Sequence, residues 1–240
     1  MFKDHDTINQ RTQRVYAANI KSIANAVRDY GLQSHQLRSF LLEGAEPEKT
    51  PHRPNHNGCS YRNAEKPSNQ IPVTEKRICR CMYYCNRLNA TKTQQAKCDM
   101  CDFPGKRRNI SNYIILDYDV PMPYVVPGVG GIDLLVRSPD SKIYAIEVKP
   151  ADSEESLARM VAEILTYCEI SDYSVENCGN TLAVRPAVCF FKDSQQWDDY
   201  IELQSNPDLL YLLEKIKVFY IDQDEVSFTI HDAEESPICR

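Results

Sequence analysis

Long apolar runs are missing from this sequence of 240 residues. No stretch approaches the roughly 20 apolar residues that a membrane-spanning helix needs, so we expect no membrane span and no membrane partner. The first ten residues, MFKDHDTINQ, are polar from the third onward, which disfavours a secretory signal. Because 42% of the residues are hydrophobic and 26% charged, the composition is that of an ordinary globular protein. We therefore expect an intracellular protein, either cytoplasmic or in the nucleoid or nucleus.

Acidic residues are scarce between residues 76 and 108, although the whole chain has a net charge of −6. Nine lysines and arginines in this segment are opposed only by Asp99 and Asp102, which gives it a charge of +7 and leaves −13 for the rest. A basic segment on an acidic protein can bind a polyanion locally, whereas a solvated lysine-rich loop is the alternative. The candidates for nucleic-acid binding here are Arg80, Arg87, Lys106, Arg107 and Arg108.

The first 45 residues have a helical pattern. Thr7 and Gln10 fit a capping box, in which each side chain satisfies a free backbone N–H of the other residue. Apolar residues then recur at helical spacing until Gly31, which is well suited to end the helix in a left-handed conformation. A second short helix is expected over 34–42. The apolar stripe of the first helix consists of Tyr16, Ile20, Ile23, Val27 and Tyr30.

Four further regions follow this helical segment. Prolines among polar residues indicate a linker over 46–75, followed by a basic, cysteine-rich module over 76–111. Residues 112–232 then predict a layered α/β core, and 233–240 form a tail. Within the core we expect strands at 113–120, 131–137, 142–149, 181–191, 218–221 and 226–230, with helices over 153–170 and within 195–217.

Two of the expected strands are joined by Ser138-Pro-Asp-Ser-Lys142, a strong turn signal. An antiparallel hairpin centred near Asp140 would place Asp133 directly opposite Glu147, about 4.5–5.5 Å apart at Cβ. Strand alternation puts Lys149 on the same face as Glu147. The sequence therefore predicts that two carboxylates and one lysine meet at one end of this hairpin.

This combination of side chains suits phosphodiester hydrolysis. Neighbouring carboxylates repel each other unless a cation neutralises them, and Mg²⁺ or Mn²⁺ prefers such oxygen ligands. The ion could polarise a phosphodiester and acidify a bound water, while a lysine orients that water or stabilises charge. We interpret Asp133, Glu147 and Lys149 as a catalytic cluster. The alternative is that Asp133 is a strand-end residue beside the flexible segment 128–131, while Glu147 and Lys149 form an exposed pair.

Gly131-Ile-Asp133 followed by Ile-Glu147-Val148-Lys149 resembles the motifs of the PD-(D/E)xK nuclease superfamily, and the order of elements around them is similar. The resemblance covers roughly residues 112–232. It implies a restriction-endonuclease-like core, with a mixed central sheet flanked by helices. It also implies Asp133, Glu147 and the Val148 carbonyl as ligands of Mg²⁺ or Mn²⁺, with Lys149 as a water-positioning base or electrostatic aid.

Two further features extend this resemblance. Many members of the superfamily use an acidic residue from a helix before the sheet, for which Glu43 and Glu75 are both candidates. Glu163-Ile-Leu-Thr-Tyr167 resembles the glutamine-x-x-x-tyrosine of RecB-like exonucleases, with glutamate in place of glutamine. The resemblance implies that Glu163 and Tyr167 contact nucleic acid; the alternative is that Tyr167 belongs to the core.

Five of the ten cysteines lie within 23 residues, which favours a metal site over disulfides in a reducing compartment. Two closely spaced pairs are a reasonable match to a structural Zn²⁺ site. An iron–sulfur cluster and cysteines without metal are the alternatives. The four expected ligands are Cys81, Cys85, Cys98 and Cys101, with Cys79 as a possible substitute.

The sequence thus predicts a Mg²⁺- or Mn²⁺-dependent nuclease that acts on nucleic acid, with DNA favoured over RNA, and carries a cysteine-bound metal module. Two other classes stay open. One is a nuclease-like scaffold that binds nucleic acid without cutting it. The other is an interaction protein that recruits partners through its acidic face and its metal module.

Overall fold

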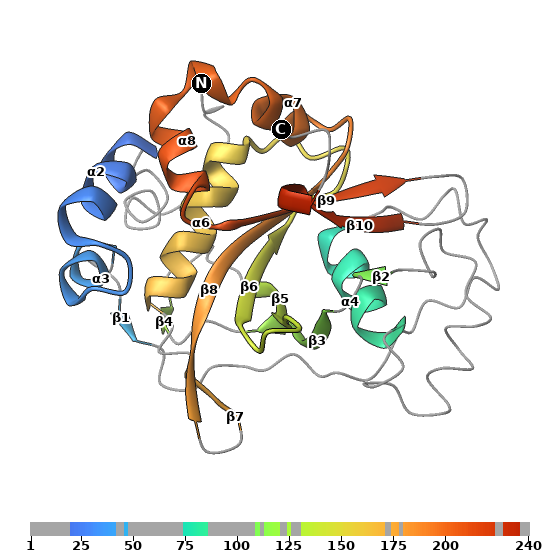
Figure 1. Ribbon diagram of the computed structural model, residues 1–240, viewed down its shortest axis with the longest axis horizontal. Helices are drawn as coiled ribbons and strands as arrows, with labels where there is room; N and C mark the ends of the chain where they lie inside the picture. Colours follow the sequence, from blue (N-terminus) through green and yellow to red (C-terminus); the bar gives the residue numbers. More distant parts are fainter. Residues whose placement is uncertain are drawn as a thin grey trace.

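The computed structural model shows an α/β architecture in which helices cover both faces of a mixed central sheet (Figure 1). This confirms the expected fold class at the level of its layers. Among the described residues, no helix has the length and apolar character needed to span a bilayer. The structure describes residues 20–41, 46–47, 74–85, 109–110, 113–120, 124–125, 131–170, 174–177, 180–223 and 228–235.

The sheet has the strand order β2-β10-β9-β8-β6-β5-β3, and β7 pairs with β8 outside this path. Strands β6, β8 and β9 run parallel to one another, whereas β5 is antiparallel to both β3 and β6. The parallel centre is buried on both faces, so β6 is apolar at most positions. The strands are β2 (Asn109–Ile110), β3 (Ile114–Val120), β5 (Ile132–Arg137), β6 (Ile143–Val148), β7 (Ser174–Asn177), β8 (Asn180–Phe191), β9 (Lys217–Gln223) and β10 (Phe228–Asp232).

The register of the β5–β6 hairpin is the one that the turn signal predicts. Leu134 pairs with Ile146, and Leu135 pairs with Ala145. The turn is closed by a hydrogen bond from the Ser138 N–H to the Lys142 carbonyl, 2.9 Å long. Because a slip of one residue would reverse every side chain, this register decides which residues reach each face.

One face of the sheet is covered by α6 (Leu157–Ile170), with α2 (Ile20–Tyr30) and α3 (His35–Leu41) packed against it (Figure 1). Of the expected apolar stripe of α2, Ile23 and Val27 are buried, whereas Tyr30 is 47% exposed. The helix ends before Gly31, whose φ of 76° is left-handed as predicted. The capping residues Thr7 and Gln10 lie outside the described residues.

The helix expected within 195–217 is in fact broken. It comprises α7 (Gln195–Ile201), a 3₁₀ turn η2 (Leu203–Ser205) and α8 (Pro207–Leu213). Asn206 accepts a hydrogen bond from the Leu209 N–H and so caps α8, and Pro207 occupies its first turn, where it has no helical hydrogen bond to lose. A short 3₁₀ helix, η3 (Ala233–Glu235), follows β10 within the expected tail.

The opposite face of the sheet carries α4 (Glu75–Cys85), which packs on β3 and β5 (Figure 1). Ile78 and Met82 are buried there against residues of the sheet. This helix crosses the expected boundary between linker and cysteine-rich module, since its first residue belonged to the predicted linker. Within that same linker, β1 (Glu46–Pro47) pairs with β4 (Tyr124–Val125).

Candidate metal centre

The site lies where β5 and β6 separate. The pairing of β5 with β6 ends at Leu134 and Ile146. Beyond this point the Asp133 carboxylate, rather than the backbone of β5, forms the hydrogen bond to β6. Its Oδ2 accepts a hydrogen bond of 2.8 Å from the backbone N–H of Val148. The N–H of Lys149 instead donates to the Cys189 carbonyl of β8, at 3.0 Å. Asp133 and Glu147 therefore meet at the fork of the sheet, as the hairpin register predicts.

Close approach of β3 to the start of β5 requires a glycine at position 131. A Cβ atom built there would lie 2.3 Å from the carbonyl oxygen of Val120, a distance that no real side chain tolerates. Ile132 pairs with Val120 immediately afterwards. The glycine before Asp133 thus sets the position of the strand that carries this carboxylate.

A third carboxylate reaches the fork from the other layer. Glu75, in the first turn of α4, brings an oxygen within 4.8 Å of oxygens from Asp133 and Glu147. The sequence left Glu43 and Glu75 as equal candidates for such a residue; Glu43 lies outside the described residues, and Glu75 is in place. We call Glu75, Asp133 and Glu147 the acidic cluster.

Burial makes this arrangement costly without a cation. The pKa of Asp133 is raised well above its usual value by burial and then by the charges of Glu147 and Glu75. Burial also raises the pKa of Glu147, although the nearby Lys149 ammonium opposes the shift. Burial, and then the neighbouring carboxylates, therefore penalise the ionised forms of Asp133 and Glu147.

One oxygen of the acidic cluster is conspicuous. Oε2 of Glu147 is buried and has no hydrogen-bond partner among the described residues. A buried carboxylate oxygen that accepts no hydrogen bond costs free energy unless something else satisfies it. Three carboxylates in reach of one point are a suitable ligand set for a hard divalent cation such as Mg²⁺ or Mn²⁺. The residues present therefore fit the expected ion.

Lys149 is the cation of the site, and its side chain is only 8% exposed. Its Nζ lies 2.7 Å from Oε1 of Glu147 and 2.9 Å from Oε2 of Glu75. Burial disfavours the ammonium, but the carboxylates around it, led by Glu147 and Glu163, outweigh this and raise the pKa of Lys149. The predicted trio of Asp133, Glu147 and Lys149 is thus brought together.

Helix α6 and the loop before it add charges around Lys149, of which only Glu163 was a candidate from the sequence. Lys149 Nζ lies 3.2 Å from Oε2 of Glu155 and 3.7 Å from Oε2 of Glu163. The second oxygens of these two glutamates face Arg159, at 3.7 Å and 3.3 Å. Lys149, Glu155, Arg159 and Glu163 therefore form a ring of alternating charge. The available signal was the spacing of four residues between Arg159 and Glu163 on α6, with Glu155 another four residues earlier in the preceding loop.

The loop that carries Glu155 is held by α7. The Gln196 side-chain amide donates hydrogen bonds to the carbonyls of Ser153 and Glu155. The carboxylate of Asp199 accepts the Leu157 N–H at 2.8 Å and so caps the start of α6. Gln196 is completely buried. These contacts explain why Glu155, although in a loop, reaches the buried lysine.

Of the other expected nucleic-acid contacts, those within the described residues are buried or half-buried. Tyr167 is 3% exposed and lies in the core between α6 and the sheet, which corresponds to its alternative interpretation. Glu163 is also buried and faces Lys149. Arg80 lies half-buried on α4. Arg87, Lys106, Arg107 and Arg108 lie outside the described residues.

The cysteine module is only partly described. Cys79 and Cys81 lie on α4 and are buried in the apolar layer between this helix and the sheet. Burial, and then the charge of Asp133, raises the pKa of the Cys79 thiol well above its usual value. The Cys85 side chain, Cys98 and Cys101 lie outside the described residues, so the expected zinc or iron–sulfur site stays a prediction.

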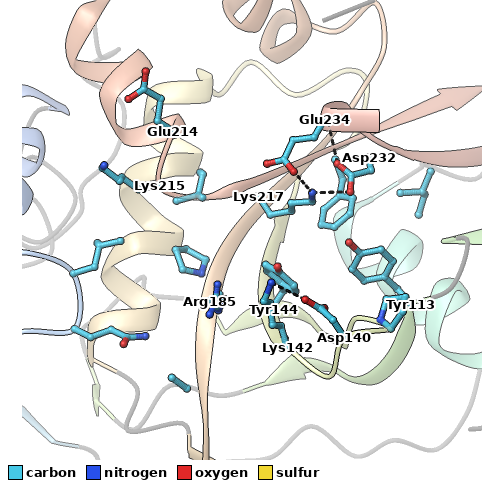
Figure 2. A pocket seen from close by; sticks show the side chains of 18 residues that line it. Tyr113, Asp140, Lys142, Tyr144, Arg185, Glu214, Lys215, Lys217, Asp232 and Glu234 are labelled. Carbon is cyan, nitrogen blue, oxygen red and sulfur yellow. Dashed lines mark hydrogen bonds and ion pairs between the residues drawn. The ribbon is translucent and has the colours of Figure 1, made fainter. Parts of the chain in front are cut away.

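A pocket of about 680 Å³ lies at the other end of the sheet, around the beginning of β6 and β9 (Figure 2). Several of the charges that line it are paired with one another. Lys217 Nζ lies 2.7 Å from Asp232 and 2.6 Å from Glu234, and Lys142 Nζ lies 2.6 Å from Asp140. The pocket is therefore distant from the acidic cluster in the fold and different from it in chemistry.

Family models, curated proteins and solved structures were each compared with this chain, and none matches it. Its function is therefore inferred from the chemistry of the acidic cluster.

Proposed function

We propose that this protein is a Mg²⁺- or Mn²⁺-dependent nuclease that hydrolyses phosphodiester bonds, with DNA as the expected substrate. One observation carries the proposal. Three carboxylates converge beside a buried lysine, and one of their oxygens, Oε2 of Glu147, is buried and finds no hydrogen-bond partner in the described part of the chain. The position of this cluster at the fork of a mixed sheet also supports the restriction-endonuclease-like core that the sequence suggests.

Each residue has a role in this proposal. Glu75, Asp133 and Glu147 would hold the metal ion, with the Val148 carbonyl as a further ligand that the family resemblance implies. When bound, the ion would polarise the phosphodiester and acidify a water molecule. Lys149 would donate hydrogen bonds to that water or to a phosphate oxygen, and the contacts of its ammonium with two of the three carboxylates support this role. Val148 also orients Asp133 through its N–H.

The second part of the proposal concerns the basic, cysteine-rich segment. A Zn²⁺ ion, or an iron–sulfur cluster, would be bound by Cys81, Cys85, Cys98 and Cys101, and the surrounding lysines and arginines would hold phosphates of the substrate. Cys79 is a weaker candidate ligand, since it is buried beside Asp133 and Cys189. Metal analysis of the purified protein distinguishes zinc, iron and absence of metal.

A cleavage assay tests the first part. Labelled single-stranded DNA, duplex DNA and RNA are incubated with the protein in Mg²⁺, Mn²⁺ or EDTA. We expect cleavage of DNA that needs the divalent ion and disappears in Lys149→Ala. Lys142→Ala is the matched control, since it removes a lysine from the other end of the same strand and should leave cleavage unchanged.

Two other outcomes would replace this proposal. A folded, metal-loaded protein that binds nucleic acid but cuts none of the substrates would be a nuclease-like binding scaffold. A folded protein that neither binds nor cuts would favour an interaction protein that uses its acidic face. Cleavage that survives in Lys149→Ala would exclude the assigned site.

A further inference from the structure

Helix α6 presents one positive side chain at the rim of the site. Arg159, in its first turn, has a side chain that is 30% exposed, whereas Lys149 below it is 8% exposed. Glu163 and Tyr167, the two α6 residues for which family resemblance implies strand contact, are both buried. A nucleic-acid strand that approaches along α6 would therefore meet Arg159 before either of them.

The surroundings of Arg159 hold its guanidinium in a defined position. Its Nε donates to Oε1 of Glu163 at 3.3 Å, and its Nη2 lies 3.7 Å from Oε1 of Glu155. Both glutamates are held in turn by Lys149, which closes the ring of alternating charge. A planar guanidinium fixed on both sides loses little entropy when it binds a phosphate, and its fork matches phosphate oxygens.

The net charge of the groups around the metal centre gives a reason for a cation at the position of Arg159. Apart from Arg159 itself, the acidic cluster and the ring contain five carboxylates (Glu75, Asp133, Glu147, Glu155 and Glu163) and one cation, Lys149. Even a divalent ion leaves such a site without excess positive charge, so the site by itself does not attract a polyanion. A phosphate that flanks the scissile bond needs a positive partner outside the buried part, and Arg159 lies there.

We propose that Arg159 binds a phosphate of the nucleic-acid strand next to the scissile bond, and that Glu155 and Glu163 orient it for this contact. The inference rests on the proposed nuclease function and adds to it the residue that holds the strand beside the metal centre. It assigns to Glu163 an indirect role, that of positioning Arg159 and Lys149, in place of direct contact with the substrate.

Salt dependence of binding separates a phosphate contact from a purely structural role. Binding of labelled DNA is measured by fluorescence anisotropy over a range of NaCl concentrations, with Ca²⁺ in place of Mg²⁺. We expect Arg159→Ala to weaken binding roughly tenfold and to reduce the slope of log K against log salt by about one unit. Arg159→Lys keeps the charge and should restore the slope. Arg185→Ala, an exposed arginine at the far pocket, should leave it unchanged.

Backbone substitution then locates the contact. In a set of DNA ligands, each phosphate near the cleavage position is replaced in turn by a neutral methylphosphonate. We expect one substitution to weaken wild-type binding without weakening Arg159→Ala any further, because both changes remove the same contact. If Arg159→Ala fails to fold, the double variant Arg159→Ala/Glu163→Gln removes one charge of each sign and takes its place.

Failure of this inference about Arg159 can be told apart from failure of the proposed nuclease function. If the wild type cuts DNA and Arg159→Ala keeps the salt slope, or if methylphosphonate losses are additive at every position, this inference is overturned while the nuclease stands. If the wild type neither binds nor cuts, both are overturned. A reduced slope that Arg159→Lys restores, together with coupling to a single phosphate, supports the inference.

Discussion

The two ends of the β5–β6 hairpin carry similar side chains in opposite electrostatic situations. At the turn, Asp140 and Lys142 are exposed and paired, and the pKa of Asp140 is lowered to about 2 by hydrogen bonds, first from Lys142 and then from Ser138. At the fork, burial and neighbouring carboxylates raise the pKa of Asp133 and Glu147. The two sites lie at opposite ends of the same pair of strands, β5 and β6, so the length of these strands separates them.

The turn holds charges that neutralise each other, whereas the fork holds charges that need a further partner. At the turn, the exposed charges of Asp140 and Lys142 neutralise each other in water, as those of a surface ion pair do. The fork gathers carboxylates in the interior, where desolvation is large and one lysine does not balance them. Such an arrangement is unfavourable for stability alone, which is why we propose that a divalent cation binds it.

The largest expected effect is on cleavage. Asp133→Asn should lower the rate of metal-dependent DNA cleavage by about a thousandfold, because it removes a ligand charge and weakens electrostatic stabilisation of the reaction. The same substitution at the turn, Asp140→Asn, should leave the rate unchanged. Single-turnover cleavage of labelled DNA measures both, and equal rates for the two variants would contradict the contrast between the ends.

The next effect is thermal stabilisation by metal. A divalent ion at a hundred times its Kd stabilises the folded state by about 2.7 kcal/mol, which corresponds to a rise in Tm of roughly 5–10 °C in a protein of this size. We expect this rise with Mn²⁺ in the wild type and none in Glu147→Gln. Asp232→Asn, at the far pocket, should keep it. Calorimetry on EDTA-treated protein provides the test, and an equal rise in Glu147→Gln would count against the site.

A smaller effect concerns the glycine that positions the fork. Gly131→Ala should lower the free energy of unfolding by about 1–3 kcal/mol, since the new methyl group would overlap the Val120 carbonyl and push β5 away from β3. Gly31→Ala meets no atom within 4 Å and pays only for its left-handed backbone, roughly 1 kcal/mol. Urea denaturation compares the two, and Gly131→Ala alone should also reduce metal affinity.

The smallest effect is at the turn. Because the folded pKa of Asp140 is depressed, its stabilisation is present above the ordinary pKa of about 4 and is lost as the pH falls toward 2. Lys142→Ala should move the pKa of Asp140 back toward its ordinary value. Carboxyl-carbon NMR titration follows this directly. An unchanged titration in the variant would show that the Lys142 contact is not made in solution.

Part of the site was accessible from the sequence because it depends on local patterns. The turn Ser138–Lys142 decides the hairpin register, and the register decides that Asp133 and Glu147 meet with Lys149 nearby. The alternation of strands and helices likewise predicts a layered α/β fold, whereas the mixed sheet was implied by the family resemblance. These inferences use spacings of a few residues, where backbone geometry leaves few choices.

What the sequence could not decide depends on how distant segments pack. Glu75 reaches the cluster only because α4 lies on the second face of the sheet, and the charge ring forms only because α7 holds Glu155 against Lys149. Tyr167 shares a helix face with Glu163, yet the layer of α2, α3 and α6 over the sheet buries it. By itself, the sequence determined the hairpin and its charged end, because hydrogen-bond pairing fixes neighbours along two adjacent strands. Tertiary structure decided which other charges join that end, because contacts between layers depend on packing that no local pattern encodes.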